Sequence, residues 1–193
     1  MSATPLIATG EACRLEVATA VAGTDTLILS YLFRNGSLNP VFVFNRLYKG
    51  LDDDRRYKVD PNLIYVQLDG TQIILSKKVI PVPEDVDVEK PEVPLVTYLP
   101  PQGTVQEKLT LKLPLRLRAP YTSTKPKPVL PKLDQLKFYF EIGFFASKSQ
   151  KTQEQAAKVA TTAGEALRID PFPAAHQRVL RVGPLPAVAV AVE

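Results

Sequence analysis

Alternation of apolar and polar residues with a period of two dominates this chain of 193 residues. In 12–17, for example, Cys13, Leu15 and Val17 share one face, whereas Arg14 and Glu16 share the other. This pattern is typical of β-strands, because successive side chains point to opposite faces of a sheet. We therefore expect strands over 12–17, 26–34, 41–48, 63–68, 71–75, 105–117, 138–144, 177–182 and 187–192.

Two of these segments carry information about their place in a sheet. The segment 26–34 is apolar on both faces, which indicates a central strand. The segment 105–117 places leucines on one face and Lys108, Lys112 and Arg116 on the other. Proline has no N–H to donate to a neighbouring strand, so Pro114 predicts that this segment lies at a sheet edge or a bulge.

Turns and loops divide the strands. Two turn residues, Asp69 and Gly70, separate 63–68 from 71–75, which predicts a two-residue β-hairpin. The charged stretch 49–62 is expected to be a loop, and the proline-rich, acidic stretch 81–101 is expected to be an extended loop or edge structure.

The pattern changes after residue 147. Thr152 and Gln155 have the spacing of a capping box, and Ala156, Val159 and Ala160 fit one face of a helix that would stop at Gly164. We therefore expect a short helix here, followed by one or two strands.

Eight or nine short strands with little helix predict an all-β fold, namely a β-sandwich, with a β-barrel as the alternative. The alternating stretch 27–33, the turn 35–40 and the strand 41–48 resemble those of immunoglobulin-like sandwiches. The resemblance covers 11–146, concerns the fold alone and lacks the Cys…Trp…Cys spacing of antibody domains, since the chain has no tryptophan. The expected organisation is a sandwich domain over 1–146 and a C-terminal extension over 147–193 that packs on the same domain.

The residue types needed for most active sites are scarce. One cysteine and one histidine exclude a disulfide scaffold and the common zinc sites. Cys13 and His176 could form a nucleophilic pair, but the alternation around Cys13 favours a core thiol and a structural or exposed histidine. Asp52, Asp53 and Asp54 do not match a calcium loop and indicate a charged turn, together with Asp60. We expect no enzyme, no cofactor and no metal.

The sequence also gives an indication of the cellular compartment. There is no run of 18 apolar residues, and the N-terminus lacks the basic and apolar regions of a secretory signal. We expect a cytoplasmic protein with no membrane span, although removal of a signal sequence would leave the same pattern.

Charge is distributed unevenly along the chain. Residues 1–100 carry 10 basic and 13 acidic side chains, whereas residues 101–193 carry 14 basic and 7 acidic ones. The candidate partner-binding residues lie in the basic region: Lys108, Lys112, Arg116, Arg118, Lys125 and Lys127. They could be a solvated edge that opposes aggregation, a surface for an acidic protein, or a site for nucleic acid or lipid headgroups. The stretch 125–128 could be a polyproline ligand or a spacer between sheets, of which we favour the spacer.

These observations lead to an expectation about function. We expect a non-catalytic protein-binding or assembly module that acts through sheet edges and the basic strand face, with a protein partner or another copy of the chain. A small hydrolase that uses carboxylates is the alternative from another class, and a nucleic-acid binder is a weaker one.

Overall fold

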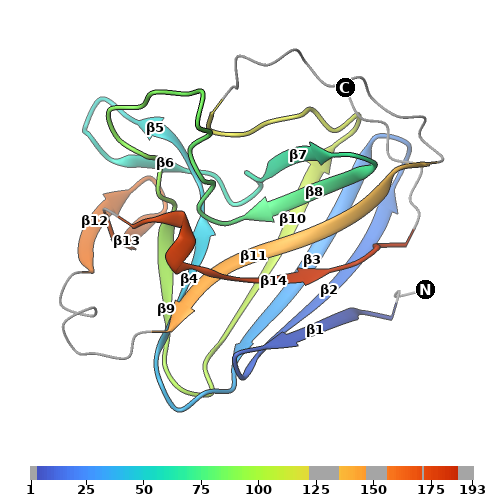
Figure 1. Cartoon of the computed structure of the whole chain (residues 1–193), viewed down its shortest axis with the longest axis horizontal. Coiled ribbons are helices and arrows are strands. Elements are labelled where there is room, and N and C mark those ends of the chain that lie inside the picture. Colours follow the sequence, from blue (N-terminus) through green and yellow to red (C-terminus); the bar gives the residue numbers. More distant parts are fainter. Residues whose placement is uncertain (1–3, 122–134, 147–155, 171, 187–193) are drawn as a thin grey trace.

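The computed structural model describes residues 4–121, 135–146, 156–170 and 172–186, and the fold is all-β with two sheets, one of them curled into a half-barrel (Figure 1). The strands are β1 Leu6–Gly10, β2 Cys13–Ala22, β3 Thr26–Asn35, β4 Val41–Arg46, β5 Tyr48–Leu51, β6 Tyr57–Val59, β7 Tyr65–Asp69, β8 Gln72–Lys77, β9 Leu95–Leu99, β10 Thr104–Lys112, β11 Lys137–Ala146, β12 Ala157–Thr161, β13 Gly164–Arg168 and β14 Arg178–Val182. No helix among these residues is long and apolar enough to cross a membrane.

The first sheet is antiparallel with the order β1-β2-β3-β10. In β3, one face is buried against the second sheet through Leu27, Leu29 and Phe33, whereas the other face is only partly covered. The prediction of a central strand over 26–34 is confirmed, because β3 pairs with β2 on one side and with β10 on the other. β10 is an outermost strand, as the proline at position 114 predicted.

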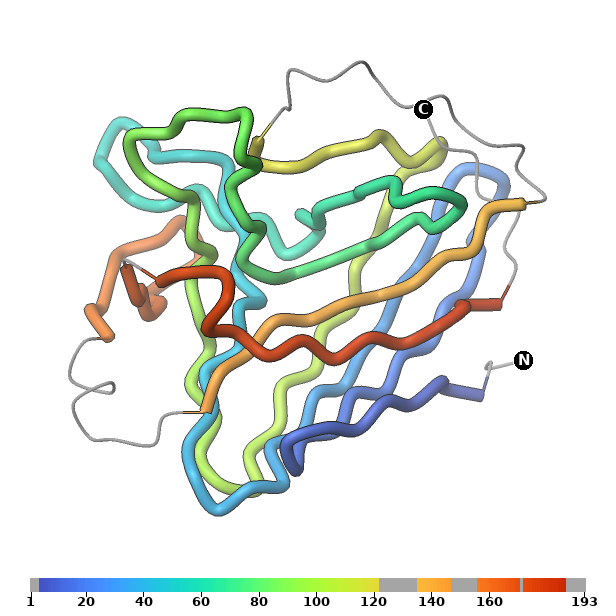
Figure 2. The backbone as a smooth tube through the Cα atoms, in the orientation of Figure 1, coloured from blue at the N-terminus to red at the C-terminus, as the bar shows by residue number. Residues whose placement is uncertain are grey.

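The second sheet has the order β5-β6-β12-β13-β9-β4-β11-β8-β7 and is built around the long strand β11. Along one edge, β11 pairs with β8 in parallel and then with β4 in antiparallel orientation. Along its other edge it pairs with β14, which follows it closely in Figure 2. Because its partner along this edge changes from β8 to β4, β11 joins the β7–β8 hairpin to the rest of the curled second sheet.

The main core lies between the two sheets. It takes Leu15, Leu29 and Leu109 from the first sheet and Leu75, Phe140 and other residues from the second, all of them almost fully buried. Two aromatic pairs join the sheets across this core, Tyr31–Phe140 and Phe33–Phe144, each with ring centroids 5.2 Å apart. Burial of this apolar surface is the main source of stability.

A second apolar cluster covers the other face of the second sheet. Phe42 and Phe44 of β4 alternate with the inward-facing Val41 and Val43, so β4 is buried on both faces. Phe172, from the segment between β13 and β14, packs on Phe44 with the ring centroids 4.8 Å apart. The described residues after β13 thus cover the outer face of β4 through Phe172. They also extend the second sheet through the pairing of β14 with β11.

The helix expected over 152–163 is wrong for its described part. Residues 157–161 form β12, which makes a hairpin with β13, and the described C-terminal residues contain only a 3-10 turn at Ala174–His176. Thr161 builds the hairpin turn, because its hydroxyl donates to the Gly164 carbonyl and accepts the Ala163 N–H. Tertiary pairing with β6 and β9 overrides the local helix signal. The proposed cap, Thr152 and Gln155, lies outside the described residues.

Other expectations need smaller corrections. The stretch 49–62 is not only a loop, since it holds β5 and β6, and β9 lies inside the stretch 81–101. The hairpin β7–β8 is confirmed, but Asp69 pairs with Gln72, so Gly70 and Thr71 form its turn. The strand expected over 105–117 ends at Lys112, immediately before Leu113 and the non-donating Pro114. The strand expected over 187–192 lies outside the described residues.

Candidate functional site

β10 carries two of the four described residues that the sequence singled out for partner binding. Its odd-numbered residues Leu109 and Leu111 are buried in the core, whereas Lys108 and Lys112 are exposed on the outer face of the first sheet. Lys108 lies opposite Ser30, and Lys112 lies opposite Thr26. Neither lysine forms an ion pair with another described residue.

The backbone of β10 is open on one side. The Thr110 N–H points away from β3 and donates to the side-chain oxygen of Asn62, 2.8 Å away. Because N–H directions alternate along an antiparallel strand, those of Gln106 and Lys108 point to the same side. β10 ends its sheet in the described structure, so this side presents unpaired backbone groups over 104–108, up to the point where Asn62 covers the edge.

The outer face of β2 and β3 carries mainly short side chains in its middle. Ala18, Ala20 and Ser30 lie there with Ile28, and all four are partly or fully exposed. Charged groups lie at its ends: Arg34, and Arg14, whose guanidinium is 2.8 Å from the Glu16 carboxylate. A solvent-facing sheet surface is usually more polar, so this face is suited to close contact with another polypeptide.

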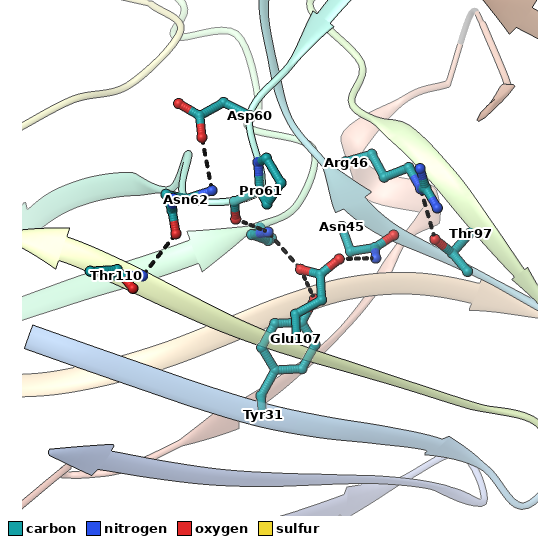
Figure 3. Close-up of polar contacts among 10 residues, drawn as sticks. Tyr31, Asn45, Arg46, Asp60, Pro61, Asn62, Thr97, Glu107 and Thr110 are labelled. Atoms are coloured by element: carbon teal, nitrogen blue, oxygen red, sulfur yellow. Dashed lines mark hydrogen bonds and ion pairs between the residues drawn. The ribbon is translucent and has the colours of Figure 1, made fainter. Parts of the chain in front are cut away.

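Glu107, on the inner side of β10, is the centre of a polar cluster (Figure 3). Its carboxylate accepts hydrogen bonds from Tyr31 Oη at 2.6 Å, Asn45 Nδ2 at 2.7 Å and Lys77 Nζ at 2.7 Å. Lys77, whose side chain is 0% exposed, also donates to the Pro61 carbonyl at 3.0 Å. The cluster therefore ties the edge strand β10 to β3, β4 and β8, which holds its outer backbone in a fixed position.

Burial changes the proton affinities in this cluster. It lowers the pKa of Lys77, and the carboxylate of Glu107 acts in the opposite direction. Burial raises the pKa of Tyr31 well above its ordinary value, and the adjacent Glu107 carboxylate raises it further. Tyr31 is therefore a permanent hydrogen-bond donor to Glu107 near neutral pH. Because Lys77 is fully enclosed, we interpret the cluster as a support that positions β10.

The sequence analysis did not single out Lys77 or Glu107, although a signal was present. Glu107 has the same parity as Leu109 and Leu111, and Lys77 has the same parity as Ile73 and Leu75. A charged residue on the apolar face of an alternating segment is a candidate buried ion pair, because a buried charge needs a partner. Their pairing across 30 positions has no local signal.

The other predicted site residues lie elsewhere. Arg116 and Arg118 are exposed but follow the end of β10, and the Arg118 backbone makes two hydrogen bonds of 2.8 Å with Val66. These bonds cover the outer edge of β7. Lys125 and Lys127 lie outside the described residues. Of the predicted basic residues, the described part of the chain therefore places only Lys108 and Lys112 on a strand.

The candidate catalytic and metal-binding residues are dispersed. Cys13 is 2% exposed in the main core, which confirms the core thiol, and burial raises the pKa of Cys13 to about 11. His176 is exposed in the 3-10 turn beside Phe172. In the aspartate loop, Arg56 pairs with Asp52 and Asp54, and Lys49 pairs with Asp60. Within the described ranges, no three His, Cys, Asp or Glu side chains are grouped to hold a metal ion.

Comparisons with protein-family models, curated proteins and solved structures find no match to this chain.

Proposed function

We propose that this protein is a non-catalytic binding module that takes up an acidic, extended polypeptide along the outer edge of β10. The observation that carries the proposal is the outer backbone over 104–108, with which no described strand pairs, on a strand that also exposes Lys108 and Lys112. In strand addition, backbone hydrogen bonds supply affinity, while alternate side chains supply selectivity. An acidic side chain of the added strand would lie beside Lys108, and one beyond the position covered by Asn62 would face Lys112.

The rigid support of β10 favours this mode of binding. Glu107 fixes the strand from the inner side through Tyr31, Asn45 and Lys77. An edge that is held in place loses little conformational entropy when a second strand pairs with it.

The chain itself contains a segment with the required pattern. In the loop 84–89, Asp85, Asp87 and Glu89 alternate with Val86 and Val88, and the three acidic residues are exposed. A peptide of residues 82–93 is thus a suitable probe for the acidic partner. The same segment on a second copy is one possible source of such a strand.

The first experiment is a fluorescence-anisotropy titration of labelled peptide 82–93 with the protein. The proposal predicts saturable binding that weakens at least about tenfold in the double variant Lys108→Glu/Lys112→Glu, because like charges then face the acidic side chains. The matched control is Lys58→Glu/Lys158→Glu, which changes the net charge equally at exposed positions on β6 and β12. It should retain the wild-type affinity within about twofold.

A second control tests the charge pattern of the peptide. A peptide with Asn and Gln at every Asp and Glu position should bind at least about tenfold more weakly than the acidic one. Sedimentation velocity of the protein alone reports whether the partner strand comes from another copy. Absence of peptide binding to the wild type, or equal loss in both double variants, would overturn the proposal.

The two alternatives from the sequence predict different results. A nucleic-acid binder should bind a 20-nucleotide oligothymidine, with an affinity that falls steeply as the salt concentration rises. Such a protein should not discriminate the acidic peptide from its neutral counterpart. A carboxylate hydrolase should depend on a pair of acids and be indifferent to Lys108 and Lys112.

We also propose an immunoglobulin-like arrangement for the sandwich. It is supported by the passage from β3 in one sheet to β4 in the other through the turn 35–40, which corresponds to a sheet-switching connection of such folds. Superposition of an experimental structure on immunoglobulin-like domains would test it.

A further inference from the structure

A cavity of about 640 Å³ lies on the side of the second sheet that faces away from the first sheet. One wall is the connector between β8 and β9, with Val79, Pro81 and Pro91, and the other is the segment between β13 and β14, with Phe172 and Ala175. Val79 and Phe172 belong to the cluster that covers β4. The volume is in the range of known small-molecule sites, about 300–1,000 Å³, and the lining is mainly apolar, as it is in most of them.

A double hydrogen bond sets the distance between the two walls. Gln177 Nε2 donates to the Val79 carbonyl at 2.6 Å, and the Val79 N–H donates to Gln177 Oε1 at 3.0 Å. The side-chain amide thus binds the backbone of Val79 as a neighbouring strand would. Phe172 is held in turn by Phe44 and Phe145, each with ring centroids 4.8 Å away. The cavity is therefore supported by fixed elements on both sides.

Asp170 supplies a polar group to this lining. Its side chain is 6% exposed, and its Oδ2 atom accepts from Lys90, with the two atoms 2.5 Å apart, and from Arg168. Its Oδ1 atom is buried, with almost no surface open to the cavity, and has no hydrogen-bond partner among the described residues. The carboxylate is thus enclosed in the wall by its cationic partners, and the groups open to the cavity are mainly apolar.

We propose that this cavity binds a neutral, mainly apolar small molecule. A cationic ligand is disfavoured because Lys90 and Arg168 already pair with the Asp170 carboxylate. An anionic ligand is disfavoured because the ammonium group of Lys90 in the lining is already paired with Asp170, and Glu89 adds a further carboxylate. The residues differ from those of the β10 edge, so this proposal and the proposed function can fail separately.

The probe is N-phenyl-1-naphthylamine, a neutral aromatic amine whose fluorescence rises in apolar surroundings. The proposal predicts saturable one-to-one binding to the full chain. Absence of saturable binding would overturn the proposal.

Cavity-filling variants locate the binding. Ala175→Phe places a large side chain at an exposed position of the lining and should weaken binding of the amine at least about tenfold. Ala20→Phe, at an exposed position on the first sheet, is the matched control and should leave the affinity within about twofold. Pro91→Phe fills the cavity from the opposite wall and replaces Ala175→Phe if that variant does not fold. Wild-type affinity in a folded cavity-filling variant would contradict the proposal.

Discussion

Lys77 Nζ lies 2.7 Å from Glu107 Oε2, and the Lys77 side chain is fully enclosed whereas that of Glu107 is 22% exposed. The pair connects β8 of the curled sheet to the edge strand of the first sheet. Burial of two charges is expensive, so the pair contributes less to stability than to the fixed position of β10.

The difference in exposure predicts unequal effects of removing each partner. Glu107→Gln leaves an ammonium group enclosed without its counter-charge and should lower the free energy of unfolding by about 3 kcal/mol. Lys77→Met should cost less, because Glu107 keeps Tyr31, Asn45 and some solvent as partners. Urea denaturation of both single variants and of the double variant measures the coupling. Additive effects, or a smaller loss for Glu107→Gln than for Lys77→Met, would contradict this account.

The double hydrogen bond between Gln177 and Val79 gives a second prediction. Gln177→Ala leaves the N–H and C=O groups of the buried Val79 without partners and should destabilise the protein by about 2–3 kcal/mol. Gln106→Ala, which removes an exposed glutamine from β10, is the control and should change stability by less than about 0.5 kcal/mol. Chemical denaturation compares the free energies of unfolding of the two variants. Equal values would show that the hydrogen bonds between Gln177 and Val79 do not stabilise the protein.

Cys13 gives a prediction about pH. Burial raises the pKa of Cys13 to about 11, and Glu11 adds to the effect, whereas the thiol of an unfolded chain titrates near 9. Between these values the unfolded chain binds fewer protons than the native protein, so the free energy of unfolding should fall as the pH rises from 9 to 11.

The matched variant for this test is Cys13→Val, which keeps an apolar side chain in the core. Its free energy of unfolding should fall less steeply over the same pH interval, and the remaining slope should come from buried tyrosines such as Tyr31, whose pKa is also raised. Parallel pH profiles for the variant and the wild type would show that the thiol makes no contribution.

Asn62 limits the open part of the β10 edge. Asn62→Ala exposes the Thr110 N–H and lengthens the backbone available to an added strand, so peptide 82–93 should bind about threefold more tightly. The effect should disappear in the Lys108→Glu/Lys112→Glu background. Weaker binding in Asn62→Ala with unchanged stability would indicate that Asn62 itself contacts the peptide.

Local alternation was sufficient to predict much of the fold. It identified the inward faces of β2 and β10, and the Asp69–Gly70 pair identified the β7–β8 hairpin. It failed where pairing partners are distant in sequence. β12 was predicted as helix because alanines and a capping-box spacing are compatible with one, and its pairing with β6, a hundred residues earlier, has no local signal.

The candidate site was predictable only in part. The exposed Lys108 and Lys112 follow directly from period-two alternation. The Thr110 N–H is covered by Asn62, which lies 48 residues away in the sequence. The contact of Lys77 with Glu107 depends on where β8 lies relative to β10. Such contacts are consequences of the tertiary fold and have no counterpart in the local pattern.

Amide hydrogen exchange along β10, with and without peptide 82–93, tests strand addition most directly. The N–H groups of Val105, Glu107 and Leu109 point toward β3 and should be protected in the free protein. Those of Gln106 and Lys108 point outward, and saturating peptide should slow their exchange by at least about tenfold. Unchanged exchange at Gln106 and Lys108 in the peptide-bound protein would contradict the account.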